Sequence, residues 1–476
     1  MPFIKKFYFN QTSMLGLSLF MRKSVQTCLR AVLGVSFLLF LQVSWAEESK
    51  PVAQAQDPSF EEFMLRGQST YINQYKPSFA SALPDGPNSL VRSAETSYTW
   101  TNTFFFGWRA QRDLEFYFVP EMNVGIPFSA LAGMGGFTNG EITRAAGSTP
   151  TVYRQKLFLR KTFNEGDLTE VVAADVDQLK GLVSRNRWVL TAGNFSNLDV
   201  FDDNAYAKDP RTQFMNWGNM TYAAYDYAAD ARGYGWGVAL EWYKENWALR
   251  LSRMTGPKLP NGLPVDFQIG KHFGDQFEIE RSHYLMNQAG KSRFIVWHDR
   301  ANVANFNDAL AYGLANPNLT NRQWIFQART GEKDKYGLGF NLEQQINESL
   351  GVFARAMRAD GKTETYAFTE VDASLALGAV MNGSSWGRGL DVVGVSYLQN
   401  KLSAERQNYL RNGGISFFIG DGYLAYKPEL ILETFYSLSL GKQTALTFDV
   451  QSVRNPAYNS LRGPVMVTGF RLHTEF

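Results

Sequence analysis

The sequence predicts an all-β protein: a closed antiparallel transmembrane β-barrel of 16 strands, with one long connection folded inward as a constriction loop. Three observations predict this fold class. Apolar and polar side chains alternate with a period of two in segments of about ten residues. Long and short connections alternate along the chain, and the last segment, which ends at Phe476, has the same alternation. That last segment can pair with the first, so that no sheet edge is left unpaired in the bilayer.

The composition excludes several other classes of protein. The 476 residues are 45% hydrophobic, 19% charged and 14% aromatic, with a mean hydropathy of −0.26. Charged residues make up about a quarter of an ordinary soluble domain, so this chain is poor in charge and rich in rings. It is too polar for a bundle of membrane-spanning helices and too rich in apolar residues for a disordered chain.

Residues 1–46 predict a secretory signal peptide that is removed on export. They hold five basic residues and no acidic one, and the apolar run Ala31–Trp45 is followed by a small residue before Glu47. The single cysteine, Cys28, lies in this segment, so the mature chain is expected to contain no disulfide. The rest of the chain has 42 basic and 45 acidic residues. Such a balance gives no electrostatic reason to expect nucleic acid as a partner.

The period of two is clearest in Ser97–Trp108. Even-numbered positions there carry mostly aromatic side chains, and odd-numbered positions carry mostly hydroxyl groups. Successive side chains of a strand point to opposite faces, so this segment has one apolar and one polar face. The same pattern predicts sixteen strands, at 63–75, 96–108, 113–124, 152–163, 187–195, 231–243, 246–254, 277–285, 291–298, 335–344, 350–359, 366–377, 391–398, 428–440, 444–452 and 464–476.

The connections distinguish a membrane barrel from a soluble β-sandwich. Gaps after odd-numbered segments are mostly long, and gaps after even-numbered segments are mostly short. Long loops at one end and tight turns at the other are typical of outer-membrane barrels. Two gaps, 164–186 and 378–390, are longer than a tight turn. They are expected to be structured periplasmic excursions, unless the strand count is off by two. Residues 47–62 are expected to form a short periplasmic segment before the barrel domain, 63–476.

Several stretches resemble the OprB-type carbohydrate-selective porins. The most specific are Asp209–Trp217 (DPRTQFMNW) and Asn455–Pro464 (NPAYNSLRGP), and Gly135–Glu141 and Tyr225–Tyr234 add to them. The resemblance runs from about Gly67 to the end of the chain. It implies a 16-stranded barrel in the outer membrane of a Gram-negative bacterium, through which mono- or small oligosaccharides diffuse passively into the periplasm.

The longest connection, 196–230, is the predicted constriction loop. A barrel of this size leaves an aqueous lumen that something must narrow, and long connections are usually functional or disordered. This one is too aromatic to be disordered. Its polar residues are expected either to meet the permeating solute or to hold the loop against the wall, and they include Asp199, Asp202, Asn204, Asp209 and Arg211. Trp217 is a candidate for stacking against sugar rings.

The polar faces of the strands are expected to line the rest of the lumen. The segment 152–163 is expected to present Arg154, Lys156 and Arg160 on one face. Other strands contribute acidic residues, among them Glu115, Glu121, Glu370 and Asp372. Opposed basic and acidic walls place a transverse field across a pore, and charged rings of this kind set its selectivity.

No pattern in the sequence indicates catalysis or a bound metal. The four histidines lack metal-ligand spacing, and no convincing pair of Ser and His faces the same side near one strand end, so we expect a channel without enzymatic activity and without a cofactor. Other hypotheses are a general porin, a porin selective for a different solute and, less favoured, an outer-membrane hydrolase. The expected partners are sugar solutes, outer-membrane lipid, the barrel-assembly machinery that reads the terminal Phe476, and further copies in a homotrimer.

Overall fold

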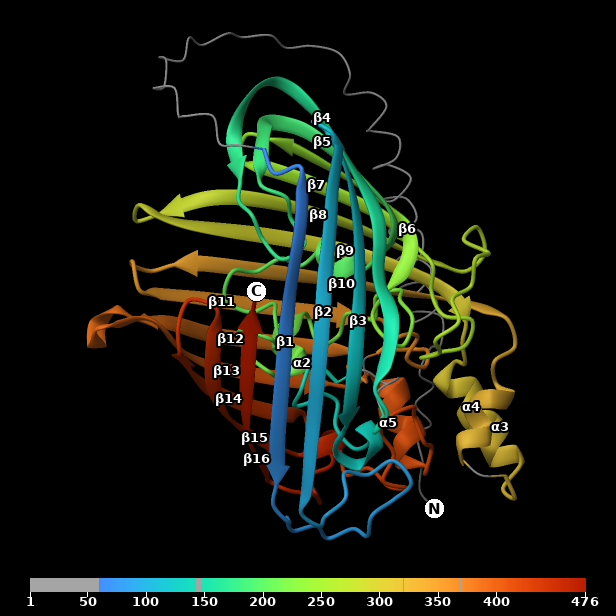
Figure 1. The fold of residues 1–476 in the computed structure, drawn as a ribbon. Helices are drawn as coiled ribbons and strands as arrows, with labels where there is room; N and C mark the ends of the chain where they lie inside the picture. The colour runs from blue at the N-terminus through green and yellow to red at the C-terminus, as the bar shows by residue number, and fades with distance from the viewer. Residues whose placement is uncertain (1–59, 143–146, 320, 369) are drawn as a thin grey trace, which may run out of the picture. The chain divides into compact units, whose positions relative to one another are not determined.

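The computed structural model describes residues 60–476, apart from 143–146, 320 and 369. The predicted signal peptide and most of the segment 47–62 lie outside the described residues. Within the described part, sixteen antiparallel strands close into one barrel in which each strand pairs with its neighbours in sequence, and β1 pairs with β16 (Figure 1). The predicted fold class is confirmed.

The strands run as follows: β1 Phe63–Lys76, β2 Glu95–Gln111, β3 Leu114–Ile126, β4 Thr151–Val172, β5 Gly181–Phe195, β6 Gly235–Lys244, β7 Trp247–Met254, β8 Phe273–Leu285, β9 Gln288–Asn302, β10 Glu332–Gln345, β11 Leu350–Ala359, β12 Ala373–Gly383, β13 Arg388–Lys401, β14 Glu429–Ser439, β15 Thr444–Arg454 and β16 Val465–Glu475. Short helices occupy the connections: α2 Trp217–Met220, α3 Phe306–Ala315, α4 Asn321–Gln327 and α5 Ala404–Arg411. No helix in the described part is both long and apolar enough to cross a bilayer.

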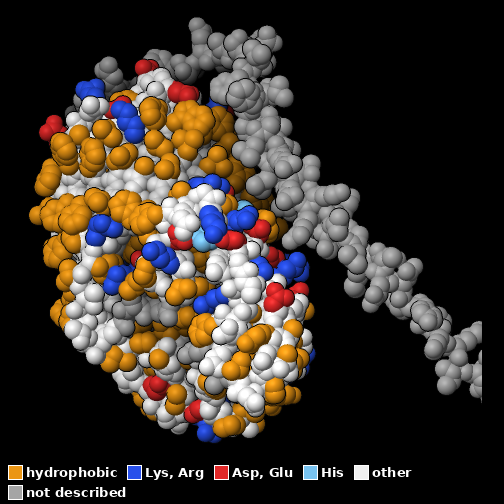
Figure 2. Space-filling model, turned by 90° about the vertical axis from the view of Figure 1, so that its right-hand side faces the viewer, with side chains coloured by type: hydrophobic (Ala, Val, Ile, Leu, Met, Phe, Trp, Pro, Cys, Tyr) orange, Lys and Arg blue, Asp and Glu red, His pale blue; other side chains and the backbone are white. Residues whose placement is uncertain are grey.

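The two faces of the strands are those that the alternation predicts. On β2, the rings of Trp100, Phe104 and Trp108 are 43–55% exposed on the outside, whereas Thr101 and Thr103 are buried on the inside. Apolar side chains gather in a broad band on the outer surface (Figure 2). Because the outer face is apolar and the inner face is polar, the barrel suits a bilayer outside and water inside.

Both unusually long predicted gaps consist largely of strand. The β4–β5 pair extends through most of 164–186 and leaves only 173–180 as its connection, and β12 and β13 are joined by 384–387. Figure 1 shows the β4–β5 hairpin curving over beyond the start of β1. The strand count of sixteen is therefore correct, and every connection after an even-numbered strand is short.

One predicted strand is misplaced. The segment 366–377 was expected to be the twelfth strand, but β12 begins at Ala373. The residues before it lie in the connection 360–372, where Tyr366 and Val371 are buried. Their alternation arises from packing inside a folded loop and not from the two faces of a strand.

Candidate functional site

The connection between β5 and β6 turns into the lumen directly after Phe195. Ser196 and Asp199 form a reciprocal capping box: the Ser196 hydroxyl accepts from the backbone of the following turn, and the Asp199 carboxylate accepts from the Ser196 N–H at 2.9 Å. This local geometry satisfies donors that would otherwise be orphaned and fixes the direction of the turn. The chain then crosses the lumen before it returns at Gly235.

Charged residues on several strands hold this loop in place. Asp202 accepts from the Arg355 guanidinium of β11 at 2.9 Å, and Asp226 accepts from Lys335 of β10 at 2.6 Å. On the opposite wall, Arg471 of β16 donates to the Pro210 carbonyl at 2.8 Å. Anchors on separated strands fix the loop inside the barrel, so the predicted inward-folded constriction loop is confirmed.

Two of the predicted solute-contacting residues of the loop serve as anchors. Asp202 is buried against Arg355 and also accepts from the Asn341 amide at 2.6 Å. Asn204 is buried, and its side-chain amide donates to the Asn341 Oδ1 at 2.7 Å. Their contacts fit the second expectation, that polar residues of the loop hold it against the wall.

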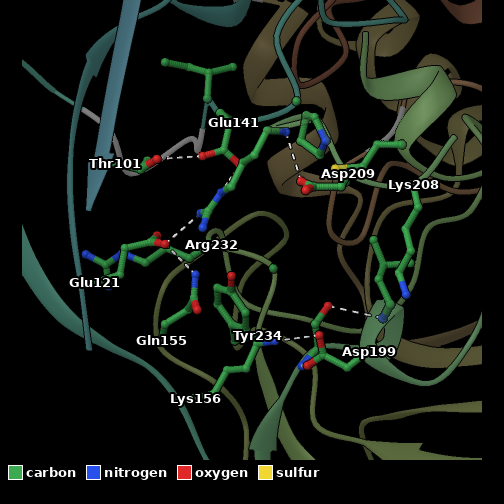
Figure 3. Close-up of a pocket in the computed structure, with 18 of the residues that line it drawn as sticks. Thr101, Glu121, Glu141, Gln155, Lys156, Asp199, Lys208, Asp209, Arg232 and Tyr234 are labelled. Carbon is green, nitrogen blue, oxygen red and sulfur yellow. Dashed lines mark hydrogen bonds and ion pairs between the residues drawn. The ribbon is translucent and has the colours of Figure 1, made fainter. Parts of the chain in front are cut away.

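The main cavity, of about 510 Å³, lies beside the loop within the lumen. Neither Asp202 nor Asn204 lines it. Its wall includes the predicted residues Glu121, Lys156, Arg160, Asp199, Asp209, Arg211 and Trp217. Figure 3 shows Glu121 and Glu141 on one part of this wall and Lys156 and Asp199 on another. The structure thus brings together most of the predicted site from β3, β4 and the constriction loop.

Lys156 is held between two carboxylates. Its ammonium group lies 2.7 Å from Asp199 and 2.8 Å from Asp177, which belongs to the β4–β5 connection. Burial raises the pKa of the Asp177 carboxyl, but the attraction of Lys156 outweighs burial and lowers it. The connection after β4 therefore reaches into the lumen and contributes to the same polar cluster as the constriction loop.

Arg211 forms the second charged cluster. It lies 2.8 Å from Glu121 of β3 and 2.9 Å from Glu141, and it donates to the Thr103 hydroxyl at 2.9 Å. Burial lowers the pKa of Arg211, but the two carboxylates outweigh burial and raise it above its usual value. Arg211 therefore stays charged. Asp209 lies beside it in a turn, where the Asp209 carboxylate accepts from the backbone N–H of Arg211 at 2.9 Å.

Aromatic rings complete the cavity wall. Trp217 packs on Phe368 with ring centroids 5.4 Å apart, and Tyr227 packs on the same ring at 5.1 Å. All three line the cavity. The Trp217 Nε1 is buried and has no hydrogen-bond partner within the described residues. The cavity therefore combines flat apolar surface with polar groups, the pairing that a sugar's ring face and hydroxyl edge require.

The predicted basic face of β4 is only partly correct. The register of β3 against β4 shifts between Val119 and Pro120, where Gln155 is the extra residue. A bulge of this kind reverses the alternation. Lys156 and Arg160 consequently face the lumen, whereas Arg154 lies over the ring of Trp236 at 4.9 Å and lines a second cavity.

Three of the predicted acidic residues lie away from the main cavity. Glu115 pairs with Arg109 at 2.6 Å on the lumen side of β3. Glu370 and Asp372 lie in the connection before β12 and not on a strand, so their expected place on the lumen wall is wrong. Both carboxylates pair with Arg406 of α5, and the distance from Asp372 to Arg406 is 2.9 Å. These ion pairs join the connection before β12 to the connection after β13.

Other residues of the cavity were not predicted. Tyr153, Gln155 and Tyr234 line it, and the first two donate to the Glu121 carboxylate. Gln155 could not be placed without knowledge of the bulge. Arg232 also lines the cavity. The only signal for it in the sequence is its place in the Tyr225–Tyr234 stretch that resembles the porin family. The described residues contain no group of three or more acidic, histidine or cysteine side chains placed to hold a metal ion.

Comparison with known proteins identifies the family and the fold. The profile of the family described as carbohydrate-selective porin, OprB family, matches residues 104–476. The high-pH structure of Pseudomonas putida OprB is similar in fold, with a TM-score of 0.64 and 13% identity over 87% of this chain and 94% of that chain. The outer membrane channel DcaP of Acinetobacter baumannii gives a TM-score of 0.48 and 10% identity over 87% and 97% of the two chains. Curated proteins gave no match. Because the family profile covers well over half of the sequence, this chain belongs to the OprB family of carbohydrate-selective porins.

Proposed function

We propose that the main cavity is the place where this outer-membrane channel discriminates among solutes, and that it binds a neutral mono- or small oligosaccharide in transit. The family and the fold are those of a passive carbohydrate channel and not of an enzyme. Transport through such a channel needs no energy source, because the solute moves down its gradient. Binding must therefore be weak enough to permit release.

One observation carries the proposal. The Lys156 cluster with its carboxylates and the Arg211 cluster line the same cavity as the rings of Trp217 and Phe368. A sugar hydroxyl can accept from the cations and donate to the carboxylates. Hydrogen bonds to charged groups are each worth roughly 1.5–3 kcal/mol. The aromatic faces supply contact for the C–H face of the ring, so recognition does not depend on a charge on the solute.

In this proposal Lys156, Arg160, Glu121, Asp199, Asp209, Arg211 and Trp217 contact the solute directly. Lys156 and Trp217 are the strongest members of that set. Lys156 is the cation shared by the constriction loop and the β4–β5 connection, and Trp217 has a buried donor whose partner the solute would supply.

Single-channel recording in planar bilayers tests the proposal. Glucose and maltose, titrated into both chambers, are expected to occlude the ion current in a saturable manner. Replacing Lys156 by Gln should raise the half-blocking sugar concentration about ten-fold, as expected for the loss of one charge-assisted hydrogen bond. The matched control is Arg253→Gln on the outer face, where Arg253 is 2.6 Å from Asp275.

A general porin would behave differently in the same experiment. Its ion current would be indifferent to every sugar, and Lys156→Gln would change only conductance and ion selectivity. That result would contradict the proposed discrimination while leaving the channel itself intact.

The proposal also covers export and assembly. We infer that residues 1–46 are removed as a signal peptide, that 47–62 lie in the periplasm, and that the barrel-assembly machinery reads the strand ending at Phe476. We further infer a homotrimer, supported by the exposed rings on β1–β3, among them Phe63, Trp108 and Phe116. N-terminal sequencing of the mature protein and its mass in detergent by light scattering test these inferences.

A further inference from the structure

The wall of the barrel has a notch where the constriction loop leaves it. The pairing of β4 with β5 ends at Leu157 and Asn194, because the chain turns inward after Phe195. Thr151–Lys156 of β4 pair with β3 on one side, and within the described residues no strand pairs with them on the other. The next strand, β6, begins only at Gly235. The sheet therefore has a local edge at this point.

A second cavity, of about 280 Å³, lies at this notch. Arg154, Asn194 and Trp236 line it from the outer face, and Leu263 and Val265 line it from the connection after β7. The remaining lining residues are Tyr153, Asp230, Arg232 and Tyr234. Tyr153, Arg232 and Tyr234 also line the main cavity, so the two cavities adjoin across these side chains.

Two guanidinium groups face this second cavity without an acidic partner. Neither Arg154 nor Arg232 has a carboxylate within ion-pair distance among the described residues, whereas Arg211, Arg250, Arg293 and Arg355 in the lumen all have one. Arg154 makes one side-chain hydrogen bond, from Nε to the Asn194 amide oxygen at 3.3 Å. Among the residues that the structure describes, the terminal nitrogens of both arginines have no hydrogen-bond acceptor and are available to a ligand.

Both guanidinium groups are held by aromatic rings. Arg154 lies 4.9 Å from the Trp236 ring centroid, and Arg232 lies 4.1 Å from that of Tyr153. Stacking on a ring uses the flat face of a guanidinium and leaves its N–H edge free. That edge matches the two oxygens of a carboxylate or phosphate in a bidentate pair. Two such groups in one cavity are therefore preorganised for an anion.

The acidic residue of this cavity does not cancel the two positive charges. Asp230 accepts from the backbone N–H of Arg232 at 2.9 Å and from that of Tyr234 at 3.2 Å. It shapes the turn before β6 and presents one negative charge against two positive ones. The cavity keeps an excess of positive charge, in contrast to the balanced clusters around Glu121 and Lys156.

We propose that the notch cavity binds the anionic group of an acidic sugar, a carboxylate or a phosphate, and so extends the substrates of the channel from neutral to acidic carbohydrates. The proposal rests on the proposed function, because the sugar ring would occupy the adjoining main cavity. The shared lining by Tyr153, Arg232 and Tyr234 favours a solute in the lumen as the source of the anion. A lipid head group would contact only the outer side of the notch.

Current block by three soluble probes tests the proposal: glucose, glucuronate and glucose 6-phosphate. The half-blocking concentrations of the two acidic sugars should be lower than that of glucose. Arg154→Gln changes a side chain that lines only the notch cavity, so it should raise their half-blocking concentration about ten-fold and change that of glucose less than two-fold. Arg232 lines both cavities, so Arg232→Gln should raise the half-blocking concentration of the acidic sugars about ten-fold and that of glucose by a smaller factor. Arg232→Lys keeps the charge but loses the planar fork, so its effect should be intermediate.

Arg253→Gln is the matched control. Arg253 also lies over a ring, 4.0 Å from that of Phe273, but it is already paired with Asp275 on the outer face. Its replacement should leave all three half-blocking concentrations unchanged. If glucose blocks normally but the acidic sugars are insensitive to both variants at the notch, the inference fails and the proposed function stands. If glucose itself does not block, the proposed function fails.

A final measurement separates the two sources of anion. Phosphorus analysis of the purified protein measures bound lipid. The double variant that combines Arg154→Gln with Arg232→Gln should carry as much lipid phosphorus as the wild type. Loss of lipid phosphorus in the double variant, with unchanged block by glucuronate, would overturn the proposal in favour of a lipid head group.

Discussion

The Asp202 carboxylate lies 2.9 Å from the Arg355 guanidinium, and both side chains are buried inside the barrel. Asp202 belongs to the constriction loop and Arg355 to β11, so this ion pair joins the loop to the wall. Arg355 also donates to the Asn219 carbonyl at 2.8 Å, in a later part of the loop. One arginine thus fixes two points of the constriction.

Replacing Asp202 by Ala should release the loop. Removing one partner of a buried ion pair leaves an uncompensated charge and costs about 3–5 kcal/mol. We expect a larger and noisier single-channel conductance and weaker block by sugar. The neighbouring Asp203 is the control: it pairs with Lys208 at 2.7 Å and lies at a longer 3.7 Å from Arg293, and the side chains of Asp203 and Lys208 are more than 40% exposed. Asp203→Ala should cost less than about 1 kcal/mol, and an equal effect of both changes would contradict the anchoring role of Asp202.

The contact between Asp177 and Lys156 predicts how the channel responds to acid. Because the folded pKa of Asp177 lies below its ordinary value, its ionised form stabilises the docked β4–β5 connection at neutral pH. This stabilisation is lost only as the pH falls below the usual carboxyl range, about 3.9, and through the folded pKa. We expect conductance to be constant from pH 7 to pH 5 and to rise at lower pH.

Charge removal should reproduce that effect at neutral pH. Asp177→Asn is expected to raise conductance at pH 7 and to abolish the further rise in acid. Asp175→Asn is the control, because within the described residues the Asp175 side chain accepts from the adjacent Val176 N–H alone, at 2.7 Å. A conductance of Asp177→Asn that matches wild type at every pH would show that the connection does not narrow the pore.

The unpartnered indole nitrogen of Trp217 predicts a separation of affinity from conductance. Trp217→Phe keeps a ring against Phe368 but removes the Nε1 donor, and one hydrogen bond is worth about 1 kcal/mol. Half-blocking sugar concentrations should rise about five-fold while the open-channel current stays the same. Trp324→Phe is the control. Within the described residues the Trp324 Nε1 also has no partner, but α4 does not line the cavity, so block by sugar should not change. Equal block of wild type and Trp217→Phe would exclude Trp217 as a donor to the sugar.

The alternation of side chains was enough to predict the barrel because it reflects a local constraint. On β2, Trp100 must face lipid and Thr101 must face the lumen whatever the rest of the chain does. The loop that narrows the pore was predictable for a similar reason, since a connection as long and aromatic as 196–230 needs something to pack against.

The finer features depend on contacts between distant parts of the chain. One extra residue, Gln155, turns Arg154 out of the lumen, and nothing in the local sequence marks the slip. In the sequence, Glu370 and Asp372 alternate with apolar residues as they would in a strand, but Glu370 is buried and its partner, Arg406, lies on α5. The cluster around Lys156 joins Asp177 and Asp199 from two connections, and no spacing in the sequence brings them together.

Closure of the barrel depends on a close contact between Phe476 and Gly67. Each donates its backbone N–H to the carbonyl of the other, at 2.9 Å and 2.8 Å, and a Cβ at Gly67 would lie 2.4 Å from the Phe476 ring. Gly67→Val should displace the ring and weaken the pairing of β1 with β16, so less protein should migrate as the folded, heat-modifiable form on gels. Gly389→Val on β13 is the control, because the nearest neighbour of a Cβ at that position is the Ser384 hydroxyl at 3.5 Å.

Deletion of Phe476 should lower the folded fraction further, since it removes both hydrogen bonds and the ring. A normal folded fraction in both Phe476-deleted and Gly67→Val proteins would mean that the remaining β1–β16 register, from Gln68 and Glu475 onward, closes the barrel without this contact.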